Sequence, residues 1–149
     1  MKTLRSFLAV ILVLVATVLV SCSSPQAVVP TYTPEKIQTI NTYRIPVDAA
    51  RNNMGELGEL IQDQDWNTTR SYIHGPLGFL RRDFRYLSDN LLPEDEEQAQ
   101  EIAADIFLRL ENIDVAAKEK NANVASEQYL KAVNDFDSYI KLVPTEPTS

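Results

Sequence analysis

The stretch spanning residues 65–91 constrains the fold more than any other part of the sequence. Its apolar residues are Trp66, Ile73, Leu77, Leu80, Phe84, Leu87 and Leu91. From Ile73 onward every gap is three or four residues, so the sequence predicts one long amphipathic helix. The middle of this stretch reads Gly75-Pro76-Leu77-Gly78. Because an interior Pro costs a helix roughly 3 kcal/mol, we expect either a bend that lets neighbouring helices pack or a loosened backbone that makes room for a partner.

The N-terminal segment has the form of a targeting signal, which we expect to cover residues 1–21. A basic head precedes an apolar run that is shorter than the roughly 20 residues needed to span a bilayer. The run ends in Leu19-Val20-Ser21-Cys22, which resembles the lipobox of bacterial lipoproteins. That resemblance implies that Cys22 carries a diacylglyceryl group and becomes the N-terminus after cleavage. The alternative is an ordinary secretory signal that ends near Ser21 and leaves a free thiol.

Size and charge favour a single acidic domain behind this signal. The chain has 149 residues and a formal net charge of −7, which becomes −9 once Lys2 and Arg5 are removed. The mature chain has the usual size of one domain with its own core. An acidic body is a poor candidate for nucleic acid or for an anionic lipid surface. We therefore expect no nucleic-acid partner, and membrane contact only through the lipid anchor.

Prolines and polar turns divide the rest of the chain. The expected segments are a lipid-anchored linker at 22–45, the folded domain at 46–144 and a disordered tail at 145–149. Within the extended linker, Thr33 and Pro34 favour the start of a short helix that reaches about Tyr43. Pro46 is expected to interrupt that helix.

Four longer helices are predicted in the folded domain, at about 46–62, 65–91, 93–118 and 123–143. The sequence has no period-two alternation and no hairpin dipeptide that would indicate β-strands. Helices joined by short turns favour antiparallel neighbours, so we predict an all-α, up-down-up-down four-helix bundle. Gly55 and Gly58 weaken the first of these helices, which close contact with another helix would explain.

The sequence offers little material for catalysis. It contains one His, one Cys and no Glu-x-x-His, phosphate-loop or dinucleotide motif. We therefore expect that the protein is not an enzyme and binds no cofactor tightly. The acidic residues 94–97 open a helix, where the macrodipole favours anions, and they lack the spacing of a calcium loop. His74 is either a weak surface zinc ligand, completed by carboxylates from elsewhere, or a residue at the edge of the packed face.

Basic residues form a row on the long predicted helix. The row consists of Arg70, His74, Gly78, Arg81 and Arg85, and Arg82 extends it. These arginines either pair within the chain, with Asp83, Asp89 or the acidic start of the next helix, or form a docking face. In the second case Gly75, Pro76 and Gly78 would let a partner approach closely. The candidate docking residues are Arg70, Gly75, Pro76, Gly78, Arg81, Arg82 and Arg85.

These same residues resemble a known family. Trp66, followed by Tyr72-Ile73-His74-Gly75-Pro76-Leu77-Gly78 and then Leu80-Arg81-Arg82-Asp83, is similar to the PsbQ family of extrinsic photosystem II subunits. The lipobox makes the chain resemble the cyanobacterial lipoprotein form of that family. The acidic opening at residues 91–99 and the segment 135–139 fit the same pattern. The resemblance marks Trp66, Leu77 and Asp83 as a fold signature.

The resemblance implies a function that composition does not. Members of the family dock on the photosystem II core and other extrinsic subunits at the lumenal side of the thylakoid membrane. There they help to stabilise the oxygen-evolving centre and to retain its calcium and chloride, without catalysis of their own. Members are also associated with zinc, which keeps His74 as a candidate ligand. The alternative from a different class is an exported lipoprotein that binds zinc or a small ligand at a surface site.

Overall fold

The computed structural model describes residues 30–147, and this part of the chain is all-helical, as predicted. It contains five helices and no strand: α2 (Pro34–Gln62), α3 (Trp66–His74), α4 (Leu80–Ser88), α5 (Pro93–Lys118) and α6 (Ala122–Leu142). The predicted signal segment and the lipobox with Cys22 lie outside the described residues. No helix in the described range has the length and apolar character needed to cross a membrane.

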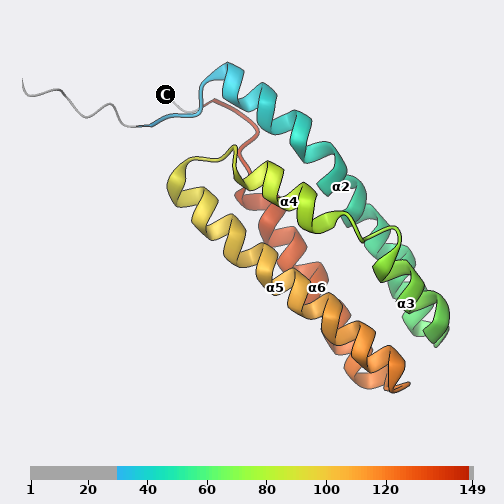
Figure 1. Ribbon diagram of the computed structural model, residues 1–149. Coiled ribbons are helices and arrows are strands. Elements are labelled where there is room, and N and C mark those ends of the chain that lie inside the picture. Colours follow the sequence, from blue (N-terminus) through green and yellow to red (C-terminus); the bar gives the residue numbers. More distant parts are fainter. Residues whose placement is uncertain (1–29, 148–149) are drawn as a thin grey trace, which may run out of the picture. The chain divides into compact units, whose positions relative to one another are not determined.

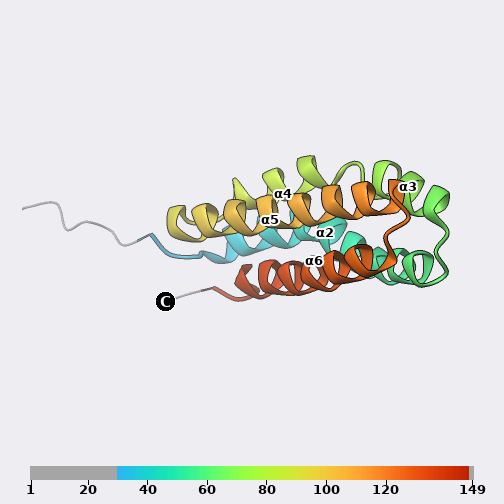
Figure 2. The ribbon, with the colours of Figure 1, turned by 90° about the horizontal axis from the view of Figure 1, so that it is seen from below.

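The helices lie side by side and enclose one apolar core. Helices α3 and α4 follow one another along α5, and each of them also contacts α2 (Figures 1 and 2). Helix α6 packs against α5 and against α2. Three aromatic rings pack together in the core between α4 and α6. They are those of Phe84, Phe136 and Tyr139, and each is at most 1% exposed. The Phe84 centroid lies 5.3 Å from that of Phe136 and 4.4 Å from that of Tyr139.

Helix α2 runs unbroken through Pro46, so the predicted interruption there is wrong. The helix starts at Pro34, where the Thr33 side chain accepts a hydrogen bond from the backbone N–H of Lys36. Ile40 and Val47, on either side of the proline, are both fully buried. Burial of apolar side chains on both sides of the proline therefore offsets its cost of roughly 3 kcal/mol. The residues predicted to form a short separate helix are the first turns of α2.

The predicted long helix is divided into α3 and α4 by a turn at residues 75–79. Pro76 cannot donate to the carbonyl of Tyr72, and the N–H of Leu77 reaches that carbonyl instead, at 3.2 Å. The N–H of Gly78 donates to the carbonyl of Gly75 at 2.9 Å. The N–H groups of Gly75, Leu77 and Gly78 thus all donate to backbone carbonyls while Leu77 stays 3% exposed. The apolar pattern was correct for burial and wrong for helix continuity.

Three of the four glycines fill positions with no room for a side chain. A Cβ on Gly78 would lie 2.6 Å from the carbonyl oxygen of His74, and one on Gly75 would lie 2.9 Å from that of Ser71. In α2, a Cβ on Gly58 would lie 2.5 Å from the Tyr129 hydroxyl of α6. Close helix contact therefore explains Gly58, as expected. It does not explain Gly55, whose Cβ would meet nothing within 4 Å.

A tyrosine fastens the segment before α2 to the start of α5. Tyr32 is 4% exposed. Its hydroxyl donates to a carboxylate oxygen of Asp95 at 2.5 Å and accepts from the backbone N–H of Leu92 at 3.0 Å. The chain is thus held at the end of the helical unit where α5 begins.

Candidate functional site

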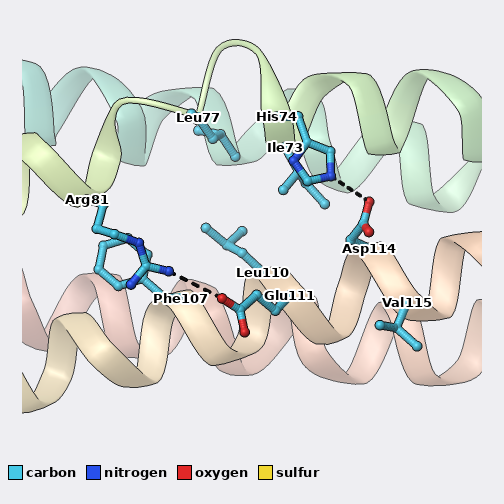
Figure 3. A pocket seen from close by; sticks show the side chains of 10 residues that line it. Ile73, His74, Leu77, Arg81, Phe107, Leu110, Glu111, Asp114 and Val115 are labelled. Atoms are coloured by element: carbon cyan, nitrogen blue, oxygen red, sulfur yellow. Dashed lines mark hydrogen bonds and ion pairs between the residues drawn. The ribbon is translucent and has the colours of Figure 1, made fainter.

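The basic row of α3 and α4 faces α5 across two neighbouring grooves. The first, which we call the His74 groove, has a volume of about 350 Å³ and an apolar floor formed by Ile73, Leu77 and Leu110 (Figure 3). Gly78 also lines it, so the turn at residues 75–79 forms part of the wall of this groove. The second, the Arg85 groove, has a volume of about 380 Å³ and lies between α4 and α5.

Two carboxylates of α5 form ion pairs with three residues of the basic row. The Asp114 Oδ1 atom lies 3.0 Å from Arg70 Nε and 3.1 Å from His74 Nε2. The Glu111 Oε1 atom lies 3.2 Å from Arg81 Nη2 (Figure 3). Because Glu111 and Asp114 are three residues apart on a helix, both side chains face the same neighbour. The row therefore joins α3 and α4 to α5.

These ion pairs differ in how far they are exposed to solvent. The Asp114 side chain is only 20% exposed, and that of Arg70 is 41% exposed. Arg81 and Glu111 are 69% and 67% exposed, so water screens their attraction and the pair contributes at most about 1 kcal/mol. The Arg81 guanidinium also lies 4.2 Å from the centroid of the Phe107 ring, a distance suited to a cation–π contact.

The remaining two arginines of the row are oriented differently. Arg82 pairs with its neighbour Asp83 at 2.8 Å, which was one of the predicted pairings. Arg85 lies 5.5 Å from the Tyr86 ring centroid. Within residues 30–147 no carboxylate lies within ion-pair distance of Arg85, in contrast to Arg70, Arg81 and Arg82. In this described part of the chain the predicted pairing with Asp89 or with the acidic start of α5 is not observed.

The other candidate residues mainly form the turn between α3 and α4 or the core of the domain. Gly75, Pro76 and Gly78 form the turn between α3 and α4, and the chain's own carbonyls explain the two glycines without a partner. Leu77 is in the core, and Trp66 packs against the core while remaining partly exposed. Whether any of these residues contacts a partner stays a prediction.

His74 has one carboxylate neighbour and a largely exposed ring. Its side chain is 67% exposed, and Asp114 is the acid within reach of Nε2. No cluster of three or more His, Cys, Asp or Glu side chains suited to a metal occurs between residues 30 and 147. Because zinc usually takes three or four protein ligands, further ligands would have to come from elsewhere. Zinc at His74 stays a prediction.

Sequence reasoning missed the α5 side of the site. Phe107, Glu111 and Asp114 lie on a helix whose pattern was interpreted only as a core stripe. A signal for two of them was present, because Glu111 and Asp114 each follow a buried residue, Leu110 and Ile113, and are three residues apart. An acidic pair on the flank of one helix matches a basic row on another.

Comparison with known proteins establishes the class of this all-helical, ion-paired domain. Residues 2–144 match the family model of PsbQ, described as oxygen evolving enhancer protein 3, and the chain belongs to that family. The predicted resemblance is therefore confirmed. At the level of a particular protein, the chain is similar to CyanoQ from Synechocystis sp.. The two are 51% identical over 146 residues, which cover 97% of this chain and 98% of CyanoQ.

Proposed function

We propose that this protein is a non-catalytic accessory subunit that docks on photosystem II at the lumenal side of the thylakoid membrane and stabilises the oxygen-evolving centre. One observation carries the proposal: the match to the oxygen evolving enhancer family extends over residues 2–144. The 51% identity to CyanoQ over nearly the whole of both chains supports it. The geometry agrees with a binding role, because the basic row consists of positioned cations and not of a nucleophile held by a base.

Membrane attachment through Cys22 is the second part of the proposal. Its support is the sequence Leu19-Val20-Ser21-Cys22 after an apolar run. Lipidation adds about 0.8 kcal/mol of membrane affinity per buried CH₂, so two or more acyl chains anchor a protein stably. Residues 1–21 would be removed, and the following residues would link the lipid to the helices. This arrangement would keep the acidic domain at the membrane without direct contact between the domain and anionic lipid.

We propose that the domain docks as an up-down-up-down four-helix bundle. Helices α2, α5 and α6 are three members of this bundle, and α3 and α4 together form the fourth. The contacts of α3 and α4 with both α2 and α5, and of α6 with both α5 and α2, support this arrangement. Such a bundle is rigid because each of its four members packs against two others. A rigid body presents its surface arginines at fixed positions, which lowers the entropic cost of docking.

Comigration tests the proposal. The full chain, expressed with its own signal in a photosynthetic host that lacks it, should comigrate with photosystem II on a native gel. Replacement of Cys22 by Ser should release most of the protein from the membrane. Replacement of Arg81 and Arg85 by Glu should weaken comigration, whereas the double replacement Lys131→Glu and Lys141→Glu on α6 provides a charge-matched control. Migration of the unaltered chain apart from photosystem II would overturn the proposal.

A second function is favoured by one contact, the 3.1 Å approach of exposed His74 to Asp114. On this alternative the protein is an exported lipoprotein that binds zinc or a small ligand at the His74 groove. Zinc that stays with the purified chain through dialysis, at one ion per chain, would support it. Loss of that zinc in His74→Ala, with Arg70→Ala as a control for the same carboxylate, would place the ion at His74.

A further inference from the structure

We infer that the Arg85 groove receives a protein segment of photosystem II in which a carboxylate lies next to an apolar side chain. The inference rests on the proposed function and specifies the docking site and the chemistry of its partner. It differs from the predicted docking face in two respects. It assigns the contact to one side of α4, and it leaves Gly75, Pro76 and Arg70 to the structure of the domain itself.

The groove has an apolar floor of suitable size. On the α4 side the floor is Phe84, which is 1% exposed, and on the α5 side it is Ala103 and Phe107. The Phe84 and Phe107 rings meet edge to face with centroids 5.7 Å apart, so the floor is rigid. Ala103 and Ala104 leave space where longer side chains would fill the groove. A volume of about 380 Å³ lies at the lower end of the roughly 300–1,000 Å³ of ligand pockets, which suits one or two side chains.

The charges at the rim select an anion at one end of the groove. Arg81 and Arg85 both line the groove and are one helical turn apart, so their guanidinium groups can approach the same carboxylate. Arg81 forms an ion pair with the exposed Glu111, and Arg85 forms none with a carboxylate among the described residues. Asp89 lines the groove one turn beyond Arg85 and disfavours a second anion there. The rim therefore fits a single carboxylate above an apolar side chain.

Charge complementarity favours a protein segment as the occupant. The chain as a whole carries a formal charge of −7, so two arginines beside an apolar hollow form a local exception. Arginine and aromatic residues are enriched at the centres of protein interfaces, and the planar guanidinium matches a carboxylate. Arg82, by contrast, is satisfied by Asp83 and does not line the groove. It provides an internal comparison on the same helix.

Binding to photosystem II complexes from a strain that lacks this protein tests the inference. Cosedimentation would give the Kd of the full mature chain and of two pairs of variants. The first pair is Arg85→Gln with Arg82→Gln as its control. The second is Ala104→Leu, which fills the groove, and its control is Ala49→Leu at an exposed position of α2. Circular dichroism and melting temperature would verify that each variant folds.

The two groove variants should each raise the Kd by about tenfold, as expected for loss of a charge-assisted hydrogen bond or of a filled pocket, and their controls by less than about twofold. A carbodiimide then locates the partner, because it joins an amine to a nearby carboxylate. Arg85→Lys should form an amide with an acidic residue of a photosystem II protein, next to an apolar residue, and Arg82→Lys should not.

The outcomes separate the inference from the function on which it rests. Unchanged affinity of Arg85→Gln and Ala104→Leu, with normal binding of the unaltered chain, would overturn the inference alone. A crosslink to a second copy of this chain, or one formed equally from Arg82→Lys, would also overturn it. Failure of the unaltered chain to bind photosystem II would overturn the proposed function and this inference together.

Discussion

The buried hydroxyl of Tyr139 provides a quantitative check of the core. Tyr139 is 0% exposed and Ser88 is 1% exposed, and their hydroxyl oxygens are 2.9 Å apart. The Tyr139 hydroxyl also lies 3.3 Å from the carbonyl oxygen of Phe84. Tyr139→Phe keeps the ring contacts with Phe84 and removes only these polar interactions. The substitution therefore isolates one buried polar cluster between α4 and α6.

The cost of Tyr139→Phe follows from the partner left behind. Loss of a buried hydrogen bond that leaves a hydroxyl unsatisfied costs about 1–3 kcal/mol. The Ser88 hydroxyl can still rotate toward the carbonyl of Phe84 one turn earlier, so we expect a value of about 1–1.5 kcal/mol, at the lower end. Ser88→Ala should cost a similar amount. The double variant should cost less than the sum of the two, because both substitutions remove the same bond.

The same hydroxyl makes the effect depend on pH. Burial raises the pKa of Tyr139 to about 12, from about 10 in an unfolded chain. Between pH 10 and pH 12 the unfolded tyrosine loses its proton while the folded one keeps it, so rising pH favours unfolding. At pH 11 this group alone removes about 1.4 kcal/mol from the stability of the unaltered chain. Tyr139→Phe lacks that loss, so its deficit at neutral pH should nearly vanish at pH 11.

Urea unfolding followed by far-ultraviolet circular dichroism measures this prediction at pH 7 and pH 11. With a slope of about 1–3 kcal/mol per molar urea, the midpoint at pH 7 should fall by about 0.3–1.5 M and the slope should stay unchanged. Tyr32 and Tyr72 also have a pKa raised to about 12, so both proteins lose stability at pH 11 and only their difference is diagnostic. Equal midpoints at pH 7, or a gap that persists at pH 11, would refute the reasoning.

Four further substitutions test other parts of the fold by thermal or urea unfolding. Gly55→Ala should stabilise the protein by about 0.5–1 kcal/mol, whereas Gly58→Ala should destabilise it by about 1 kcal/mol because it displaces the Tyr129 ring; a gain at both positions would contradict the packing of α2 on α6. Pro46→Ala should stabilise α2 by about 1–3 kcal/mol, since it restores a hydrogen bond and removes a clash in an exposed part of the helix, and a loss of stability would show that the proline has a role of its own. Tyr32→Phe should cost about 1–3 kcal/mol because it removes two hydrogen bonds at the start of α5; an unchanged midpoint would argue against that attachment.

Sequence periodicity predicted the later helices well because local signals and burial agree there. Pro93 and the acids after it predicted the start of α5, which begins at Pro93 and ends at Lys118 as expected. The apolar residues of α6 predicted its buried face, including Ala125, Ala132 and Phe136. In these helices no proline interrupts the pattern, so the three-four spacing corresponds directly to a continuous helix.

The errors in predicted helix continuity occurred at two prolines, Pro46 and Pro76. Pro46 has a high local cost, but burial of Ile40 and Val47 keeps α2 continuous. At Pro76 the result is reversed, because a carbonyl that the proline cannot satisfy is taken by the N–H of Leu77 and the helix ends. The two prolines thus behave differently. Pro76 lies between Gly75 and Gly78, which form the turn with it, whereas no glycine lies within four residues of Pro46.

The candidate site could be predicted only on one side. The basic row was visible because its residues share one helical face, but its partners Glu111 and Asp114 are 30 and 40 residues away from Arg81 and His74. A pairing across that separation depends on which helices become neighbours. Arg85 was grouped with arginines that do have partners. Its lack of a carboxylate partner among residues 30–147, on which the docking inference depends, follows from how the helices pack.

The central claim is that this protein is a subunit of photosystem II, and its abundance in the purified complex tests that claim most directly. Photosystem II would be isolated through a tag on a core subunit, and the chain would be quantified by mass spectrometry against core peptides. We expect a near-stoichiometric ratio for the unaltered chain and a clearly lower ratio for Arg85→Gln. A ratio no higher than that of unrelated lumenal proteins would contradict the account.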